Sequence, residues 1–254
     1  MSVPTYPDYD VHRFLPDVAN HEMTVLRDDG LYRHLHFRGT GFGTYWFDLV
    51  TWPGCLAING DMGGYQFRRV PDMFEFFRGP RINPDYWAEK TPQGRDSVRE
   101  YSPEQFEERV KEHVVQAIRD REAPRGIGRA VTRWLSEGGF AWEDGARKEL
   151  ESFGYGTAYD MLCTCLVRES GVADHLEWEK QHHFKVKGRR DEHIVSARRR
   201  PAFVFHDVYE WDFRDYTWQY LWACHAIRWG IEQYDNALRV LAEQSNCVSA
   251  EAAR

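Results

Sequence analysis

The sequence predicts an α+β fold in which an antiparallel β-meander sheet is covered by several helices and a buried C-terminal helix lies in the core. Two observations lead to this prediction. Between about residues 34 and 69, short apolar segments alternate with turns that contain glycine or proline, which is the pattern of consecutive antiparallel strands. Near the C-terminus, one long segment carries apolar side chains around most of a helix circumference, which is typical of a buried helix.

The first strand is predicted near His34, where Leu35 and Phe37 alternate with His34 and His36. The next segment, YWFDLVTW, is apolar on both faces and indicates a central strand. Pro53-Gly54 suits a tight turn before the return strand CLAIN. The turn GDMGG then leads into YQFRR. We therefore predict a meander of about four strands.

We predict a single domain over residues 1–254. Residues 1–22 read as an extended arm, and residues 23–70 as mainly β-meander. Residues 71–170 are predicted to be mainly helical, with Ser102 and a following proline marking the start of the longest helix there. Residues 171–254 are mixed and end in the buried helix, which we expect to pack against YWFDLVTW.

Composition restricts the compartment and the class of protein. The first residues lack the basic and apolar regions of a secretory signal, and no apolar run reaches the roughly 20 residues that span a bilayer. Five cysteines without regular spacing argue against a disulfide framework. We expect a cytoplasmic protein without a membrane partner, and we predict neither a metal site nor a cofactor.

Charge is unevenly distributed along the chain. The net charge is −7, yet the segment KVKGRRDEHIVSARRR carries seven Lys or Arg against two acidic residues, so the remainder is −12. This acidic remainder argues against a general nucleic-acid coat, and nucleic acid is allowed but not favoured as a partner. Guanidinium groups suit phosphate or carboxylate ligands, although a solvated hairpin would explain the same charges. The residues predicted to bind a ligand or partner here are Lys187, Arg189, Arg190, Arg198 and Arg199.

A first candidate catalytic site lies near the meander. His34 and His36 are two residues apart on one strand, a spacing that can chelate a metal ion. Asp61 lies in a glycine-rich turn, where a carboxylate is exposed. Asp48, on the next strand, is expected to be buried. The alternative interpretation is a polar outer strand face and an ordinary turn aspartate.

A second candidate lies in the segment HDVYEWD. If this segment is a strand, alternation places His206, Glu210 and Asp212 on one face, where they could serve as a metal cluster or a general acid and base. A salt-linked strand edge would use the same residues. Because no established catalytic motif is present, an enzyme is less favoured than a binding protein.

Two blocks of sequence resemble a known family. They are HLHFRGTGFGTYWFDLVTWPGCLAINGDMGGYQFRRVPDMFEFFR, followed by INPDYWAEK, and YTWQYLWACHAIRWGIEQYD. Together they are similar to a family of uncharacterised proteins encoded by tailed bacteriophages and prophages. The resemblance implies a protein made in the cytoplasm of an infected bacterial host and accessory to phage growth. It supplies no catalytic residues.

The predicted function combines these observations. We expect a phage accessory protein that counters a host process, such as antiviral defence, by binding a host protein complex or by sequestering a nucleotide-type small molecule. The alternative is a metal-dependent enzyme acting on nucleotides or nucleic acid. A third class is a replication partner that binds DNA through the basic segment. The oligomeric state is left open.

Overall fold

The computed structural model describes residues 11–41, 44–79, 81–156, 158–164, 181–187 and 192–252. The chain divides into two compact units. The first unit contains Met1–Glu100 and Asp215–Arg254, and the second contains Tyr101–Arg214. The second unit is therefore inserted between two segments of the first. That residues 1–254 act as a single domain stays a prediction.

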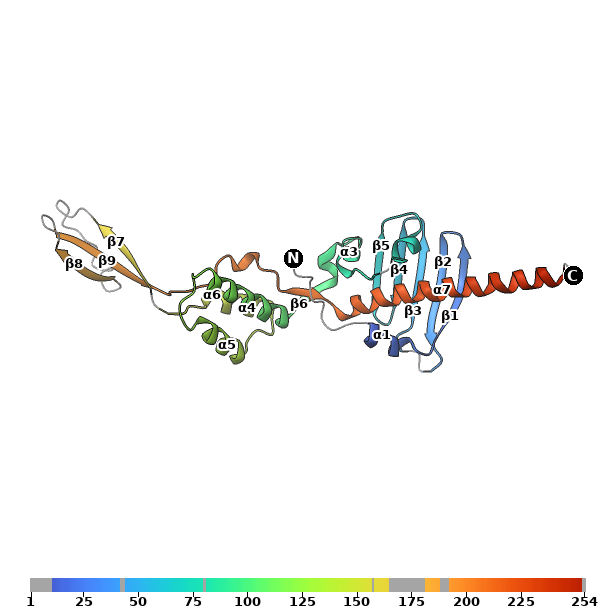
Figure 1. The fold of residues 1–254 in the computed structure, drawn as a ribbon, viewed down its shortest axis with the longest axis horizontal. Coiled ribbons are helices and arrows are strands. Elements are labelled where there is room, and N and C mark those ends of the chain that lie inside the picture. Colours follow the sequence, from blue (N-terminus) through green and yellow to red (C-terminus); the bar gives the residue numbers. More distant parts are fainter. Residues whose placement is uncertain are drawn as a thin grey trace. The chain divides into compact units, whose positions relative to one another are not determined.

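The first unit contains a five-stranded antiparallel meander with strand order β1-β2-β3-β4-β5 (Figure 1). The predicted meander is confirmed, with one strand more than expected. The additional strand β1 escapes sequence analysis because most of its residues are exposed, so its side chains show no apolar alternation. The strands are β1 (His21–Asp29), β2 (Tyr32–Gly39), β3 (Phe47–Trp52), β4 (Cys55–Gly60) and β5 (Gly63–Arg68).

Helix α7 (Trp218–Ala252) crosses one face of this sheet (Figure 1). Residues of β2 and β3 are buried beneath it, and the Trp222 ring lies edge-on to the Phe47 ring at 5.5 Å between centroids. Thr217 accepts a hydrogen bond from the Tyr220 N–H through its hydroxyl oxygen and begins the helix. The buried C-terminal helix and its packing against the central strand are thus confirmed.

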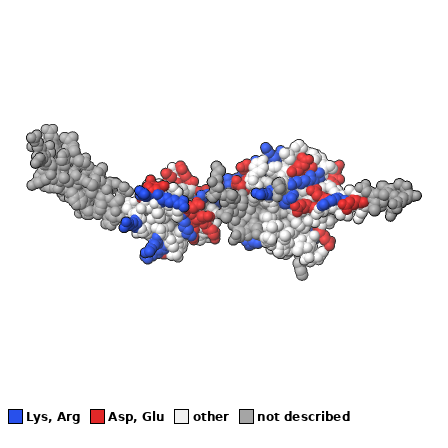
Figure 2. Space-filling model, viewed as in Figure 1, with Lys and Arg blue, Asp and Glu red and all other residues white. Residues whose placement is uncertain are grey.

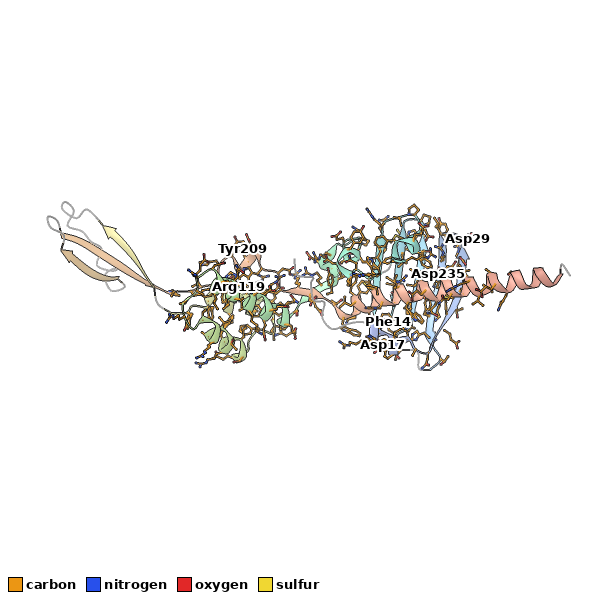
Figure 3. All side chains as sticks on the ribbon, in the orientation of Figure 1. Phe14, Asp17, Asp29, Arg119, Tyr209 and Asp235 are labelled. Atoms are coloured by element: carbon orange, nitrogen blue, oxygen red, sulfur yellow. The ribbon has the colours of Figure 1, made fainter. Side chains whose placement is uncertain are left out.

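The prediction of an extended arm over residues 1–22 is wrong for residues 11–22, which are the ones that the structure describes. Residues Val11–Val18 form helix α1, although Pro16 lies inside it. Phe14 and Val18 are one helical turn apart and both buried, so apolar packing outweighs the poor helix propensity of proline. Figure 3 shows Phe14 and Asp17 on α1, and the Trp222 Nε1–H donates to the Asp17 carboxylate at 3.0 Å.

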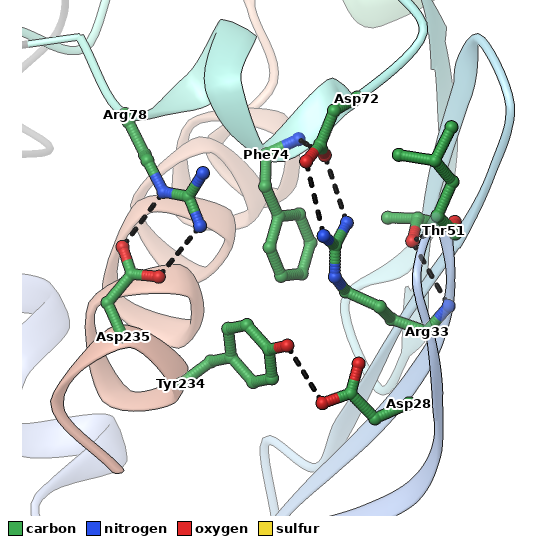
Figure 4. Close-up of polar contacts among 9 residues, drawn as sticks. Asp28, Arg33, Thr51, Asp72, Phe74, Arg78, Tyr234 and Asp235 are labelled. Carbon is green, nitrogen blue, oxygen red and sulfur yellow. Dashed lines mark hydrogen bonds and ion pairs between the residues drawn. The ribbon is translucent and has the colours of Figure 1, made fainter. Parts of the chain in front are cut away.

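Short helices complete the first unit: α2 (Met73–Phe77), α3 (Pro84–Ala88) and η1 (Arg95–Val98). The Asp72 carboxylate caps α2 by accepting the Phe74 N–H at 3.0 Å. The same carboxylate accepts two hydrogen bonds from the Arg33 guanidinium on β2, at 2.9 and 3.1 Å (Figure 4). This bidentate ion pair fixes α2 to the sheet.

The second unit contains a hydrophobic core that is enclosed by helices. Helices α4 (Pro103–Arg119), α5 (Ile127–Glu137) and α6 (Glu143–Ser152) pack around it with the turn η3 (Val208–Glu210). A three-stranded antiparallel sheet of order β7-β9-β8 also belongs to the segment Tyr101–Arg214. Its strands are β7 (Ala158–Thr164), β8 (Gln181–Lys187) and β9 (Glu192–Arg200), and the short strands β6 (Arg99–Tyr101) and β10 (Arg214–Tyr216) pair separately.

Candidate functional site

A groove of about 1190 Å³ runs along helix α4 and the segment 210–212 of the second unit. Its volume exceeds the roughly 300–1,000 Å³ typical of small-molecule pockets. Figure 3 labels Arg119 on α4 and Tyr209 on η3, the two elements between which the groove lies. The acidic residues that line it are Glu104, Glu107, Glu108, Glu112, Glu210 and Asp212, and the basic ones are Arg109, Lys111 and Arg119.

The amphipathic sequence of α4 explains why its polar side faces this groove. Phe106, Val110 and Val114 are buried in the core of the unit, at helical spacing. The charged side chains occupy the remainder of the circumference. Val115 is an exception, because it lines the groove with 45% of its surface exposed. Figure 2 shows acidic and basic side chains side by side on the surface of this unit.

Two half-buried rings belong to the same lining. The rings of His113 and Trp211 lie 4.7 Å apart between centroids, at an angle of 42°. Burial, and then the charge of nearby His206, lower the pKa of His113, so the neutral imidazole is favoured. The rings give the groove an aromatic contact surface among the charged side chains.

Arg147 on α6 fixes the segment 208–213, which forms the side of the groove opposite α4. Its guanidinium donates to the carbonyl oxygens of Val208 and Trp211, at 2.8 and 2.9 Å, and to the Glu143 carboxylate at 2.8 Å. It also lies over the Phe213 ring, 4.8 Å from the centroid. The Arg147 side chain thus fixes the backbone that positions Glu210 and Asp212 at the groove.

The structure changes the interpretation of the candidate His206, Glu210 and Asp212. The strand on which this candidate was conditional does not form, because Val208–Glu210 form the turn η3 and Val208 enters the core. Glu210 and Asp212 nevertheless lie together in the groove. His206 is exposed and acts on His113, which the sequence did not single out, through charge. The only sequence signal for His113 was its position beside the apolar stripe of an expected helix.

The structure brings His34 and His36 to one carboxylate in the first unit. The Oδ1 atom of Asp48 lies 2.7 Å from His36 Nδ1 and 3.5 Å from His34 Nε2. Positions 36 and 48 face each other in the β2–β3 register. The Asp48 side chain is half-buried, with 22% of its surface exposed. This trio lies on the sheet face opposite the one covered by α7, because Leu35 and Leu49 on the same strands point into the core.

Asp61 does not join the trio. It is exposed in the turn between β4 and β5, where its N–H donates to the Trp46 carbonyl oxygen at 3.1 Å. Among the residues that the structure describes, no group of three or more His, Cys, Asp or Glu is arranged to hold a metal ion. The predicted site at His34, His36 and Asp61 is therefore reduced to two histidines around Asp48.

The basic segment belongs to the β7-β9-β8 sheet. Lys187 is the last residue of β8 and pairs with Glu192 of β9. Arg198 of β9 pairs with Asp160 of β7 and with Gln181 of β8. Arg199 pairs with Tyr159 instead. Adjacent positions of a strand belong to opposite faces, so positions 198 and 199 do not share one face of this sheet. Arg189 and Arg190 lie outside the described residues.

Comparison with other proteins gives no match among family models, curated proteins or solved structures. In the ranges that the structure describes, no helix combines the length and the apolar character needed to cross a membrane. Helix α7 is long enough, but Arg228, Glu232 and Asp235 interrupt its apolar sequence.

Proposed function

We propose that the protein is a phage accessory protein that counters a host process, antiviral defence foremost, by binding a host protein at the α4 groove. It would act in the cytoplasm of the infected bacterium. The observation that carries the proposal is a large groove lined by charged side chains, two rings and one exposed valine. Surfaces that combine an aromatic centre with a polar rim are typical of protein–protein contact.

The charge of the groove favours a protein over a nucleotide at this site. Six carboxylates against three cationic side chains would repel the phosphates of a nucleotide signal. Sequestration of a nucleotide would therefore have to use the basic segment of β8 and β9, and it remains the alternative form of the same proposal. Neutralising Lys187, Arg198 and Arg199 together would abolish nucleotide binding and leave host-protein binding intact.

The test is a matched pair of variants on α4. Val115→Arg places a long cation in the groove, whereas Ile118→Arg places the same side chain at a position that is 50% exposed and does not line the groove. We expect Val115→Arg to lose both the co-purification of its host partner and the support of phage growth. Ile118→Arg should retain both. Equal behaviour of the two variants in both assays would overturn the proposal.

The second candidate function is a metal-dependent enzyme acting on nucleotides or nucleic acid. The observation closest to it is the pair of imidazoles that converge on Asp48 in the first unit, although the trio as it stands is not arranged to hold a metal ion. Metal analysis of the purified protein distinguishes the two functions. A stoichiometric metal ion that is lost in His36→Ala would support the enzyme, and full phage-growth support by His36→Ala would support the binding protein.

A further inference from the structure

We infer that the α4 groove takes a lysine- or arginine-bearing segment of its protein partner. This inference rests on the proposed function, since it assumes that the groove is the docking surface, and it adds the chemistry of what docks there.

Two of the three cations in the groove are already paired within α4. Lys111 Nζ lies 2.7 Å from the Glu107 carboxylate, and Arg109 lies 3.2 Å from that of Glu112. These pairs join residues three or four positions apart on an exposed helix surface, so each is neutral as a unit. Outside these pairs, Arg119 is the remaining lining cation. It is outnumbered by three further lining carboxylates, Glu104, Glu108 and Glu210, so the groove keeps a negative excess.

The uncharged part of the groove suits the rest of a basic side chain. A guanidinium or ammonium group is attracted to the face of an indole ring, and Trp211 lines the groove half-buried. The methylene stems of lysine and arginine pack on apolar surface while their charged ends stay at carboxylates. Val115 and Pro103 provide such a surface in the same groove. A small divalent cation would use the carboxylates alone and leave these contacts unused.

The carboxylates are also spaced like side chains of a peptide. Glu104 and Glu108 are four residues apart on α4, which places them about 6 Å apart along the helix axis. Alternate residues of an extended chain are separated by about 6.6 Å and point to the same side. An extended segment with basic residues at alternate positions therefore matches successive glutamates on α4. Glu210 and Asp212, across the groove, can face the other side of that segment.

The experiment titrates the full-length protein into a fluorescent hexa-arginine peptide and follows its anisotropy. The groove variant is Glu108→Gln with Glu210→Gln. The matched control is Glu149→Gln with Glu151→Gln, which removes the same charge from exposed positions of α6 in the same unit, outside the groove. We expect binding to weaken about tenfold in the groove variant and by no more than about twofold in the control.

Equal weakening in the two double variants would overturn the inference, because binding would then follow the net charge of the protein. Failure of the inference is distinct from failure of the proposed function. If Val115→Arg abolishes phage support while the glutamine variant binds hexa-arginine normally, the groove docks a partner of another chemistry. If Val115→Arg has no effect on phage support, the groove is not the functional surface.

Discussion

Gly230 lies where helix α7 comes closest to the sheet. A Cβ atom at this position would lie 2.7 Å from Leu49 Cδ1 and 3.1 Å from Phe37 Cζ, and both neighbours are fully buried. The absence of a side chain is therefore a requirement of packing, because the glycine lets a helix lie directly on two core strands.

We predict that Gly230→Ala destabilises the protein, although alanine has a higher helix propensity than glycine. In an exposed helix, Gly→Ala stabilises by about 1 kcal/mol. Here we expect Gly230→Ala to lower the free energy of unfolding by roughly 1–3 kcal/mol, because the added methyl group overpacks the core. Urea unfolding measures the change, and Gly79→Ala, where no atom lies within 4 Å of the new Cβ, is the control. A stabilised Gly230→Ala protein would contradict the packing argument.

The protonation of Asp72 should affect the stability of the first unit. Burial alone would favour its neutral form, but the hydrogen bonds from Arg33 and the Phe74 N–H, with the charge of Arg33, outweigh burial and lower the pKa of Asp72. Because the pKa of Asp72 is lower in the folded state than the value of about 3.9 in the unfolded state, ionised Asp72 stabilises the folded protein at pH values above about 3.9. This stabilisation is lost as the pH falls through the folded-state pKa.

We expect Asp72→Asn to lower the free energy of unfolding by about 3 kcal/mol at neutral pH, because it leaves the Arg33 guanidinium without its ion-pair partner. The difference from the unsubstituted protein should shrink as the pH falls below about 4. Denaturant unfolding at several pH values measures this convergence. A difference that stays constant down to pH values well below about 4 would show that the ion pair does not titrate with Asp72.

At the scale of elements, the groove depends on a clamp between α6 and the segment 208–213. Arg147 makes this clamp with three hydrogen-bonded acceptors and one ring. None of these partners except Glu143 lies near Arg147 in sequence. The clamp therefore fixes an irregular stretch of chain as one side of the groove.

Arg147→Met keeps the length of the side chain and removes its donors. We expect a loss of about 2 kcal/mol in the free energy of unfolding, because two carbonyl oxygens and a carboxylate lose their partner. Arg133→Met on α5, which is exposed, is the control and should change stability by less than about 0.5 kcal/mol. The Arg147 variant should also bind hexa-arginine more weakly, since Glu210 and Asp212 are no longer held. Unchanged stability and binding would show that other contacts hold this side of the groove.

At the scale of the whole molecule, local signals made the sheet predictable. Pro53-Gly54 and the glycines around Asp61 mark two turns, and Gly54 and Gly63 do adopt positive φ, so β3, β4 and β5 could be predicted from short-range sequence. The groove could not be predicted, because it depends on Arg147 reaching a segment about 60 residues further along the chain. Glu210 and Asp212 were identified from a strand that does not form, and His113 was not identified at all.

The two hydrophobic cores that the described residues form, one in each unit, have no residue in common. We therefore expect the effects of Gly230→Ala and Arg147→Met on the free energy of unfolding to add within about 0.5 kcal/mol in the double variant. Chemical denaturation of the two single variants and the double variant measures the coupling. An interaction energy above about 1 kcal/mol would show that the two sites are energetically coupled.

The order of the elements, with α7 long after the strands that it covers, has a consequence during synthesis. The strands that it covers are complete by Arg68, but the helix residues that bury Leu35, Phe37 and Leu49 are translated some 160 positions later. At synthesis rates of roughly 5–20 residues per second, the ribosome needs on the order of ten to thirty seconds to reach them. For that time the nascent sheet presents an uncovered apolar face. We expect newly made chains to depend on chaperones, and chains truncated before Trp218 to aggregate.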